Sequence, residues 1–404
     1  MIDKSVYSII TVGFVIRVLI PLSFPQLTSI LDRSVLFSTP ISSYRSLNEG
    51  LFLLTNELNP YKYGDLIHQP PLLLWFFTLF KRTDDYLIFA LIDTLIGIML
   101  IQINNHTSYK KSEKFNSITI GLFYFFNPMS LLTTFSKSTN LINNLILLIM
   151  IDCLLLKKFR ISIILLTLSA YLSYYSIYLI VPIIIHINKE QGGSTLKNIF
   201  KIGSLFSITL SILFYSSYII SDYSFNFLRL NYGTIILFDK ITPNMGLWWY
   251  FFTEIFEFFN DFYLSIFNIY SFIFVIPITL RFPKDLMFNI WLIIGFTNFS
   301  KTYPTISDLT LFYSMLFLFK IYFKKLKFSQ LISYLTILII LSLLPIFYFV
   351  WMNLNSGNAN FFYAIGLVLN LIQIIILTDF LWSKIQIEYY ELNNVDMNVK
   401  LSQI

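Results

Sequence analysis

The stretch Thr39–Phe80 reads TPISSYRSLNEGLFLLTNELNPYKYGDLIHQPPLLLWFFTLF and organises the front of the chain. Between Ile41 and Leu58, leucines recur at helical spacing and polar side chains fill the opposite side, which is typical of an amphipathic helix lying along a membrane surface. His68-Gln69-Pro70-Pro71 then opens a second apolar run that ends at Lys81-Arg82 and is short for a bilayer core of ~30 Å. The stretch therefore predicts two surface helices after one membrane span.

The composition identifies an integral membrane protein. Of 404 residues, 56% are hydrophobic and 12% charged, and the mean hydropathy is +0.70. At ~20 apolar residues per span, we expect an all-α polytopic protein with about 12 transmembrane helices and no large soluble domain. The net charge of +6 lies in short clusters beside apolar runs, which indicates topology rather than nucleic-acid binding. The single cysteine, Cys153, is interpreted as a buried thiol.

The basic clusters favour cytosolic termini. We expect one transmembrane domain over residues 1–404, with a first span at 1–24, a lumenal loop carrying the two surface helices at 25–85, the remaining spans at 86–382 and a cytosolic tail at 383–404. Counting the second surface helix as non-spanning puts three basic clusters in the cytosol, as the positive-inside tendency requires: Lys110 to Lys114, Lys157 to Arg160 and Lys324 to Lys327.

Three further features refine this topology. Ile161 to Ile187 is too long for one span and is interrupted at Leu172–Ser176, so we expect two short helices that meet at a lumenal turn. Trp248–Phe252 is expected as an interfacial helix, because Trp and Tyr favour the headgroup level. Arg17, inside the first span, is expected to snorkel or to pair rather than to serve a function.

Candidate binding groups gather at the expected lumenal turns. Amides offer donors and acceptors to sugar hydroxyls or phosphate, and aromatic rings offer a flat face. One such turn, WMNLNSGNANFFYA, could equally be an ordinary turn with a helix cap, and a cation at a second turn could meet either a lipid phosphate or a carboxylate of a neighbouring helix. The candidate residues of a lipid-binding cavity are His68, Lys137, Asn140, Asn144, Tyr303, Asp308, Asn353, Asn358, Asn360 and Tyr363.

The order of several motifs resembles the PIG-U family, the polytopic subunit of the glycosylphosphatidylinositol (GPI) transamidase. The motifs lie between about Ser42 and Tyr390: SSYRSLNEGLFLL, NPYKYGDLIHQPPLLLW, FFNPMSLLTTFSKSTNLINN, TPNMGLWWYFFTEIFEFF, KTYPTISDLTLFY and SGNANFFYAIGLVLNLIQIIILTDF. The resemblance implies a fold similar to the GT-C glycosyltransferases and a location in the endoplasmic reticulum membrane.

The resemblance also implies a non-catalytic role. In such a complex a caspase-like subunit supplies the nucleophile that exchanges a carboxyl-terminal signal for the GPI lipid, and the PIG-U subunit helps to hold that lipid. The implied partners are the other transamidase subunits, the GPI glycolipid and membrane lipids, with neither a cofactor nor a metal.

Two other classes compete with this interpretation. An active lipid-linked mannosyltransferase of GPI assembly needs a carboxylate base in the first lumenal loop. Asp32 is the one carboxylate at 25–40, and the neighbouring Arg33 is expected to favour its charged form and make it a poorer base. A transporter would place charges at mid-membrane, where Asp93 and Asp379 are the nearest candidates, and neither has an obvious partner in the sequence.

Overall fold

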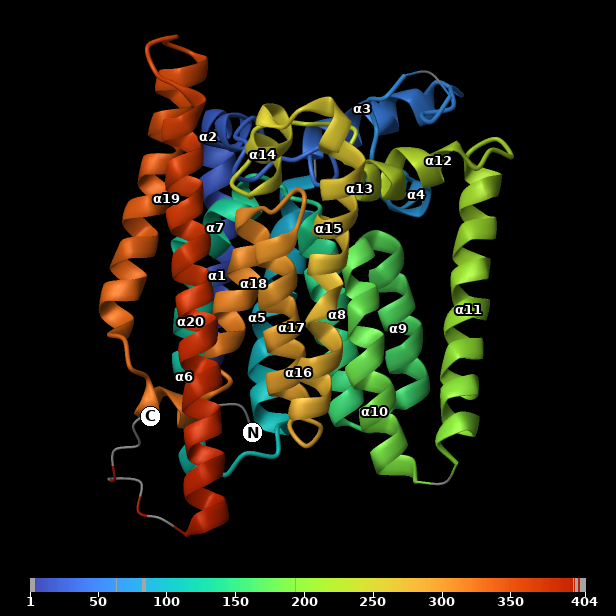
Figure 1. The fold of residues 1–404 in the computed structure, drawn as a ribbon. Coiled ribbons are helices and arrows are strands. Elements are labelled where there is room, and N and C mark those ends of the chain that lie inside the picture. The colour runs from blue at the N-terminus through green and yellow to red at the C-terminus, as the bar shows by residue number, and fades with distance from the viewer. Residues whose placement is uncertain are drawn as a thin grey trace.

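The chain forms a helical bundle with a layer of short helices across one end (Figure 1). The computed structural model describes residues 4–62, 64–81, 85–192, 194–394, 396 and 399, and these contain helices and no strand. The all-α class expected from composition is therefore confirmed for the described part. Arg82 and most of the chain beyond Asn394 lie outside the described residues.

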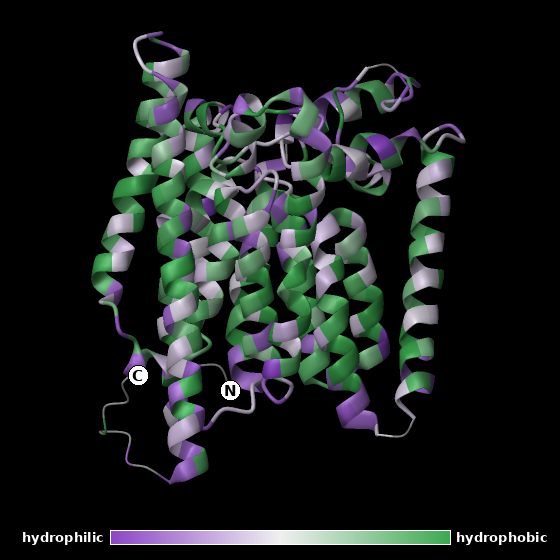
Figure 2. Ribbon diagram, viewed as in Figure 1, coloured by the Kyte–Doolittle hydropathy of each residue, from purple (hydrophilic) through white to green (hydrophobic). Residues whose placement is uncertain are grey.

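Long apolar helices run along the length of the bundle. By length and composition, the described residues hold six helices able to cross a membrane, or seven if one bent pair is counted as a span. The six are α1 (Lys4–Ser23), α5 (Asp85–His106), α11 (Thr195–Ile220), Glu257–Arg281, which includes α15 (Asn260–Ile273) and α16 (Val275–Arg281), α19 (Gln330–Met352) and α20 (Ala359–Asn393). In Figure 2 their hydrophobic residues form a broad band between more polar ends.

The bent pair is one apolar run broken at its centre. α6 (Ser117–Phe125) and α7 (Pro128–Phe135) meet at 48°. Asn127 caps α7 by accepting the backbone N–H of Met129 at 3.0 Å, and Pro128 occupies the first helical position, where its missing N–H costs no hydrogen bond. A new helix therefore begins in mid-run.

Shorter helices complete the bundle. They are α8 (Asn140–Leu155), α9 (Phe159–Leu172), α10 (Ile180–Gln191), α17 (Leu286–Ser300) and α18 (Ile306–Leu316). In α17, 14 of 15 residues are buried, so its surroundings are protein rather than lipid. α9 and α10 are joined by a 3₁₀ turn, Tyr174–Leu179, so Ile161 to Ile187 forms two short helices, as expected.

The surface layer consists of six short helices at the end of the bundle where α1 ends and α11 ends (Figure 1). They are α2 (Pro25–Asp32), α3 (Tyr44–Thr55), α4 (Pro71–Thr78), α12 (Asn226–Leu228), α13 (Thr234–Leu237) and α14 (Trp248–Glu254). At 1.5 Å per residue, the 8 residues of α4 reach about 12 Å, far short of a bilayer. α14 coincides with the expected aromatic interfacial helix.

Of two expectations about the spans, the count is not confirmed, and the start of the cytosolic tail stays a prediction because the end of a helix does not define the membrane boundary. The count of about 12 spans is not confirmed, because only the longer helices satisfy the length of a free-standing span. α20 also continues to Asn393, although a tail was expected from residue 383. Ser383 donates to the carbonyl of Tyr322 at 2.6 Å, and Ile387 and Tyr390 are buried, so packing keeps the polar-looking end helical.

The buried Arg17 is paired, which was the expected structural role. Arg17 and Asp93 form an ion pair, and both side chains are 0% exposed. The guanidinium also donates to Ser130 Oγ at 2.6 Å and to the carbonyl of Phe125 at 3.0 Å, and Tyr124 donates to Asp93 at 2.5 Å. The sequence shows no obvious partner for Asp93 because that partner lies on α1, 76 positions away.

Asp379, the other carboxylate considered for a transporter, also has partners. It accepts the backbone N–H of Lys327 at 2.8 Å and of Phe328 at 3.0 Å. Both carboxylates are therefore accounted for by contacts within the chain, and neither is left as the unpaired mid-membrane charge that a transporter would use.

Small residues bring α1 and α5 close to α6. A Cβ at Gly13 or at Gly97 would lie closer than 3.0 Å to the ring of Phe125. Because such a contact requires a neighbour to shift, glycine at both positions allows the close approach that places Arg17 within reach of Asp93.

Candidate functional site

The two surface helices are joined by hydrogen bonds near their starts. Ser43 caps α3 by accepting the backbone N–H of Ser46 at 3.3 Å, and Leu47 and Leu51 are buried on the inner face. Pro71 begins α4 at a position suited to proline. Gln69 then donates to the carbonyl of Ser43 at 2.6 Å, which holds the entry of α4 against the entry of α3.

His68 connects the segment before α4 to the segment that leads into α13 by hydrogen bonds. Its Nδ1 lies 2.5 Å from the carbonyl oxygen of Leu230 and 3.0 Å from Thr234 Oγ1, and its Nε2 lies 3.1 Å from the carbonyl oxygen of Asp65. Burial lowers the pKa of His68 below its ordinary value of 6.5, although the carbonyl of Leu230 acts in the opposite direction. The ring is only 2% exposed, so these contacts occupy both nitrogens.

Lys137 lies at the turn between α7 and α8, with a backbone φ of +53°. Its Nζ lies 4.4 Å from the centre of the Tyr44 ring, a cation–π contact. Burial lowers the pKa of Lys137, and the charges of Asp85 and Asp32 partly offset this. Tyr44 in turn donates to Asp85. Lys137 therefore lies within electrostatic reach of carboxylates of neighbouring segments. Whether it meets a carboxylate or a lipid phosphate stays a prediction.

Asn140, Asn144 and Asp308 meet in a polar core beneath the surface layer. Asn140 donates to Thr305 Oγ1 at 3.1 Å, and Asn144 donates to Ser307 Oγ at 3.1 Å. Asp308 accepts from Lys301 at 2.6 Å and from the N–H and hydroxyl of Thr305 at 2.9 Å each. These bonds fasten α8 to the start of α18.

A small cavity of about 30 Å³ adjoins this polar core and includes Asn144, Lys301 and Asp308 in its lining. It is large enough for a water molecule and far too small for a glycan. Tyr303, nearby in sequence, is 1% exposed and donates to the carbonyl of Lys240 at 2.7 Å. The structure therefore places these predicted site residues in the interior, where their side chains bond within the chain.

The turn between α19 and α20 is different, because its polar groups are exposed. Asn353, Asn358 and Asn360 are exposed. Asn358 caps α20 by accepting the backbone N–H of Asn360 at 3.1 Å, so the helix-cap alternative holds for this residue. Asn360 accepts a hydrogen bond from Tyr250 of α14, which ties the turn to the surface layer.

Aromatic rings pack under this turn and form what we call the aromatic tip: Trp249, Tyr250, Trp351, Phe362 and Tyr363. Tyr250 and Tyr363 stack with ring centroids 4.4 Å apart, and Trp249 and Trp351 stack at 5.8 Å. The indole N–H of Trp249 is buried and has no hydrogen-bond partner within the described part of the chain. Sequence reasoning noted Trp-rich stretches at both places without predicting that they meet.

The predicted site residues thus separate into three groups by their contacts. His68 bonds beneath α13, the residues around Asp308 form the polar core, and Asn358, Asn360 and Tyr363 lie at the aromatic tip. Lys137 stands between α3 and α8, beside the polar core. A single cavity lined by all of them stays a prediction.

Asp32, the alternative catalytic carboxylate, lines a separate cavity of about 440 Å³ together with Arg45, Asn48 and Glu49. Burial raises the pKa of Asp32 above its ordinary value, and the bond to the backbone of Arg45 and the charges of Lys137, Arg45 and Arg33 oppose that rise. Arg33 acts to lower this pKa, in the expected direction, but burial has the larger effect, so the pKa is raised overall. The raised pKa alone shows no reaction.

Fold and site together define a polytopic helical membrane protein whose polar and aromatic groups are gathered at one membrane face. Comparison with known proteins gives the particular family. A family model described as "GPI transamidase subunit PIG-U" matches residues 11–369. The chain therefore belongs to the PIG-U family of GPI transamidase subunits, as its motifs indicate.

Named relatives agree over almost the whole chain. The GPI transamidase component GAB1 of Saccharomyces cerevisiae is 39% identical over 376 residues, which cover 93% of each chain. The human GPI-anchor transamidase component PIGU is 30% identical over 411 residues, again 93% of each. The GAB1 homologue of Schizosaccharomyces pombe is 29% identical over 387 residues. These likenesses favour the subunit over the mannosyltransferase alternative.

Proposed function

We propose that this transamidase subunit has no catalytic nucleophile of its own and that it holds the GPI lipid headgroup at the aromatic tip while a caspase-like partner carries out the exchange in the endoplasmic reticulum. The membership of the PIG-U family supports the subunit role. Cys153, the single cysteine, lies near the end of α8 remote from the surface layer. A thiol there could not attack a peptide presented at the surface layer.

The observation that carries the lipid-holding role is the buried indole N–H of Trp249, which lies beneath exposed amides and has no hydrogen-bond partner among the described residues. A buried donor without a partner costs ~1–3 kcal/mol, and a sugar hydroxyl or phosphate oxygen would satisfy it. The stacked rings of Tyr250 and Tyr363 offer a flat face to a sugar ring. Asn358 and Asn360 supply further hydrogen-bonding groups at the level where the glycan leaves the bilayer.

A binding experiment with purified complex tests this proposal. Replacing Asn358 and Asn360 together by Ala should weaken capture of a labelled GPI analogue. Each hydrogen bond that the bound lipid would bury, and that a variant loses, costs ~1–3 kcal/mol, or about 5- to 150-fold in affinity. Because Asn358 also caps α20, Asn358→Ser with Asn360→Ala keeps a capping side chain and should show the same weakening.

The matched control is Asn393→Ala, an exposed asparagine at the opposite end of the same helix. It should bind the analogue like the parent. If both double variants assemble with their partners and bind the analogue as tightly as the parent, the GPI site lies elsewhere and these asparagines only form the turn.

The proposal includes an orientation, with the surface layer lumenal and both termini cytosolic. The loops after α5 and α8 and the loop before α19 carry the three basic clusters and lie at the end opposite the surface layer (Figure 1), as the positive-inside tendency favours. In this orientation α8, α9, α10, α17 and α18 would also cross the membrane, because helices packed against protein need no lipid-matched length. Together with the six long helices and the bent pair they make up the proposed 12 or so spans.

Accessibility labelling tests the orientation. In a Cys153→Ser background, single cysteines at 111, 158 and 324 should react with a membrane-impermeant reagent only after the cytosolic face is exposed, and a cysteine at 353 should react only from the lumen. Lumenal labelling of any basic loop would contradict the orientation.

A further inference from the structure

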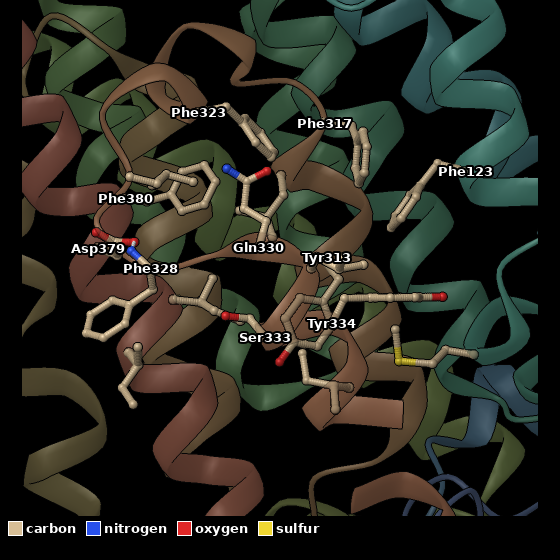
Figure 3. A pocket seen from close by; sticks show the side chains of 17 residues that line it. Phe123, Tyr313, Phe317, Phe323, Phe328, Gln330, Ser333, Tyr334, Asp379 and Phe380 are labelled. Carbon is tan, nitrogen blue, oxygen red and sulfur yellow. Dashed lines mark hydrogen bonds between the residues drawn. The ribbon is translucent and has the colours of Figure 1, made fainter. Parts of the chain in front are cut away.

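Another cavity lies away from the surface layer, between α6, α18, α19 and α20 (Figure 3). Its volume is about 340 Å³, at the lower end of the ~300–1,000 Å³ of small-molecule sites. Its walls are almost entirely apolar and include Phe123, Phe317, Phe323, Ile337, Ile376 and Phe380. Along α19 it extends from Gln330 to Ile337, about 10 Å at the helical rise. The cavity is therefore a deep apolar slot in the membrane-spanning part.

One polar group in this lining lacks a partner. Tyr313 is 4% exposed, and its hydroxyl is buried without a hydrogen bond among the described residues. A buried hydroxyl without an acceptor is costly, so an oxygen-bearing occupant would satisfy it. This observation is independent of the aromatic tip and of the proposed GPI site.

A basic loop, Lys320–Lys327, runs beside the end of the cavity remote from the surface layer. It reads KIYFKKLK, four lysines in eight residues. Asp379, which also lines the cavity, fixes this loop by accepting the backbone N–H groups of Lys327 and Phe328. Lys324 and Lys327 are exposed, and no ion pair to either is formed among the described residues. Two cations are therefore held next to the apolar slot.

We propose that this cavity binds an acyl chain of one anionic phospholipid from the leaflet opposite the surface layer, with the headgroup phosphate at Lys324 and Lys327. A slot of this shape suits a hydrocarbon chain, the lysines complement the phosphate, and the Tyr313 hydroxyl meets an ester oxygen. Lysine clusters directly beside a membrane helix are a recognised signature of anionic lipid binding. The inference concerns a resident lipid and does not rest on GPI capture at the other face.

Lipid retention by the purified complex tests the inference. The complex is reconstituted in nanodiscs of phosphatidylcholine with one fifth phosphatidylserine, then released and weighed by native mass spectrometry. We expect one retained phosphatidylserine. Lys324→Gln with Lys327→Gln should reduce this retention about 25-fold, from ~1 kcal/mol per lysine near an anionic surface. The matched control, Lys110→Gln with Lys111→Gln, removes two charges at the same end of the bundle and should retain the lipid.

A second variant, at Tyr313, and a photo-cross-linking experiment test the position of the lipid independently of the two lysines. Tyr313→Phe preserves the ring and should lower retention by at least several-fold without loss of assembly. Phosphatidylserine with a photoreactive group in its acyl chain should label α19 near Tyr334. Equal retention of phosphatidylcholine, unchanged retention in both variants, or labelling confined to other helices would overturn the proposal, as would cross-linking that shows a partner subunit's helix in the cavity.

Discussion

Removing Arg17 should destabilise the bundle far more than removing Arg17 and Asp93 together. In the variant Arg17→Met, the carboxylate of Asp93 stays 0% exposed and keeps only Tyr124 at 2.5 Å and Ser130 at 3.3 Å as donors. Breaking one partner out of a buried ion pair costs ~3–5 kcal/mol, because it leaves an uncompensated charge. We therefore expect Arg17→Met to lower the free energy of unfolding by about that amount.

The double variant Arg17→Met with Asp93→Leu replaces both charges by apolar groups of similar size. Because the desolvation of the pair is then removed together with its attraction, the double variant should lose clearly less than the sum of the single losses. Ser130→Ala is the control within the same network. It should lower the free energy of unfolding by only about 1 kcal/mol, because Arg17 and Asp93 stay paired with each other.

Equilibrium unfolding of detergent-solubilised protein, titrated with sodium dodecyl sulfate, measures these differences. The coupling free energy of the double-mutant cycle should be about 2 kcal/mol or more. Additive losses within ~0.5 kcal/mol would refute the reasoning, because they would show that Arg17 and Asp93 contribute independently.

Three further outcomes are expected. Asp308→Ala should lower the free energy of unfolding by ~3–5 kcal/mol, because Lys301 then loses its ionic partner, and Asp308→Asn should lower it clearly less. Equal losses in the two variants would contradict an ionic role for Asp308. His68 has a lowered pKa, so its contribution to stability is present above about pH 6.5 and is lost as the pH falls through the folded-state pKa. The variant His68→Gln should therefore show a weaker dependence of thermal stability on pH between pH 7.5 and 5.5. If the variant and the parent lose stability in parallel over this range, His68 is not the group responsible. Asp32→Asn should leave GPI attachment by the complex largely intact, whereas complete loss with normal assembly would support a catalytic Asp32.

Local patterns determined much of this protein. Hydropathy and helical spacing predicted the membrane class, the first span and the surface helices at Thr39–Phe80, because each depends on residues within a few turns of one another. The order of loop motifs predicted the PIG-U family, which the comparisons confirm. The count of about 12 spans stays a prediction, because the short helices are too short to be identified as spans by length alone, and whether they cross the membrane depends on the helices that pack around them.

The tertiary structure decided which polar residues meet. Arg17 finds Asp93 76 positions away, and His68 finds Leu230 162 positions away. Asn360 meets Tyr250 across 110 positions. Hydropathy reports how each segment partitions into the membrane, but it carries no record of its neighbours. A buried polar group must satisfy its hydrogen bonds within the fold, so whether it forms a core contact or an exposed site depends on helix packing.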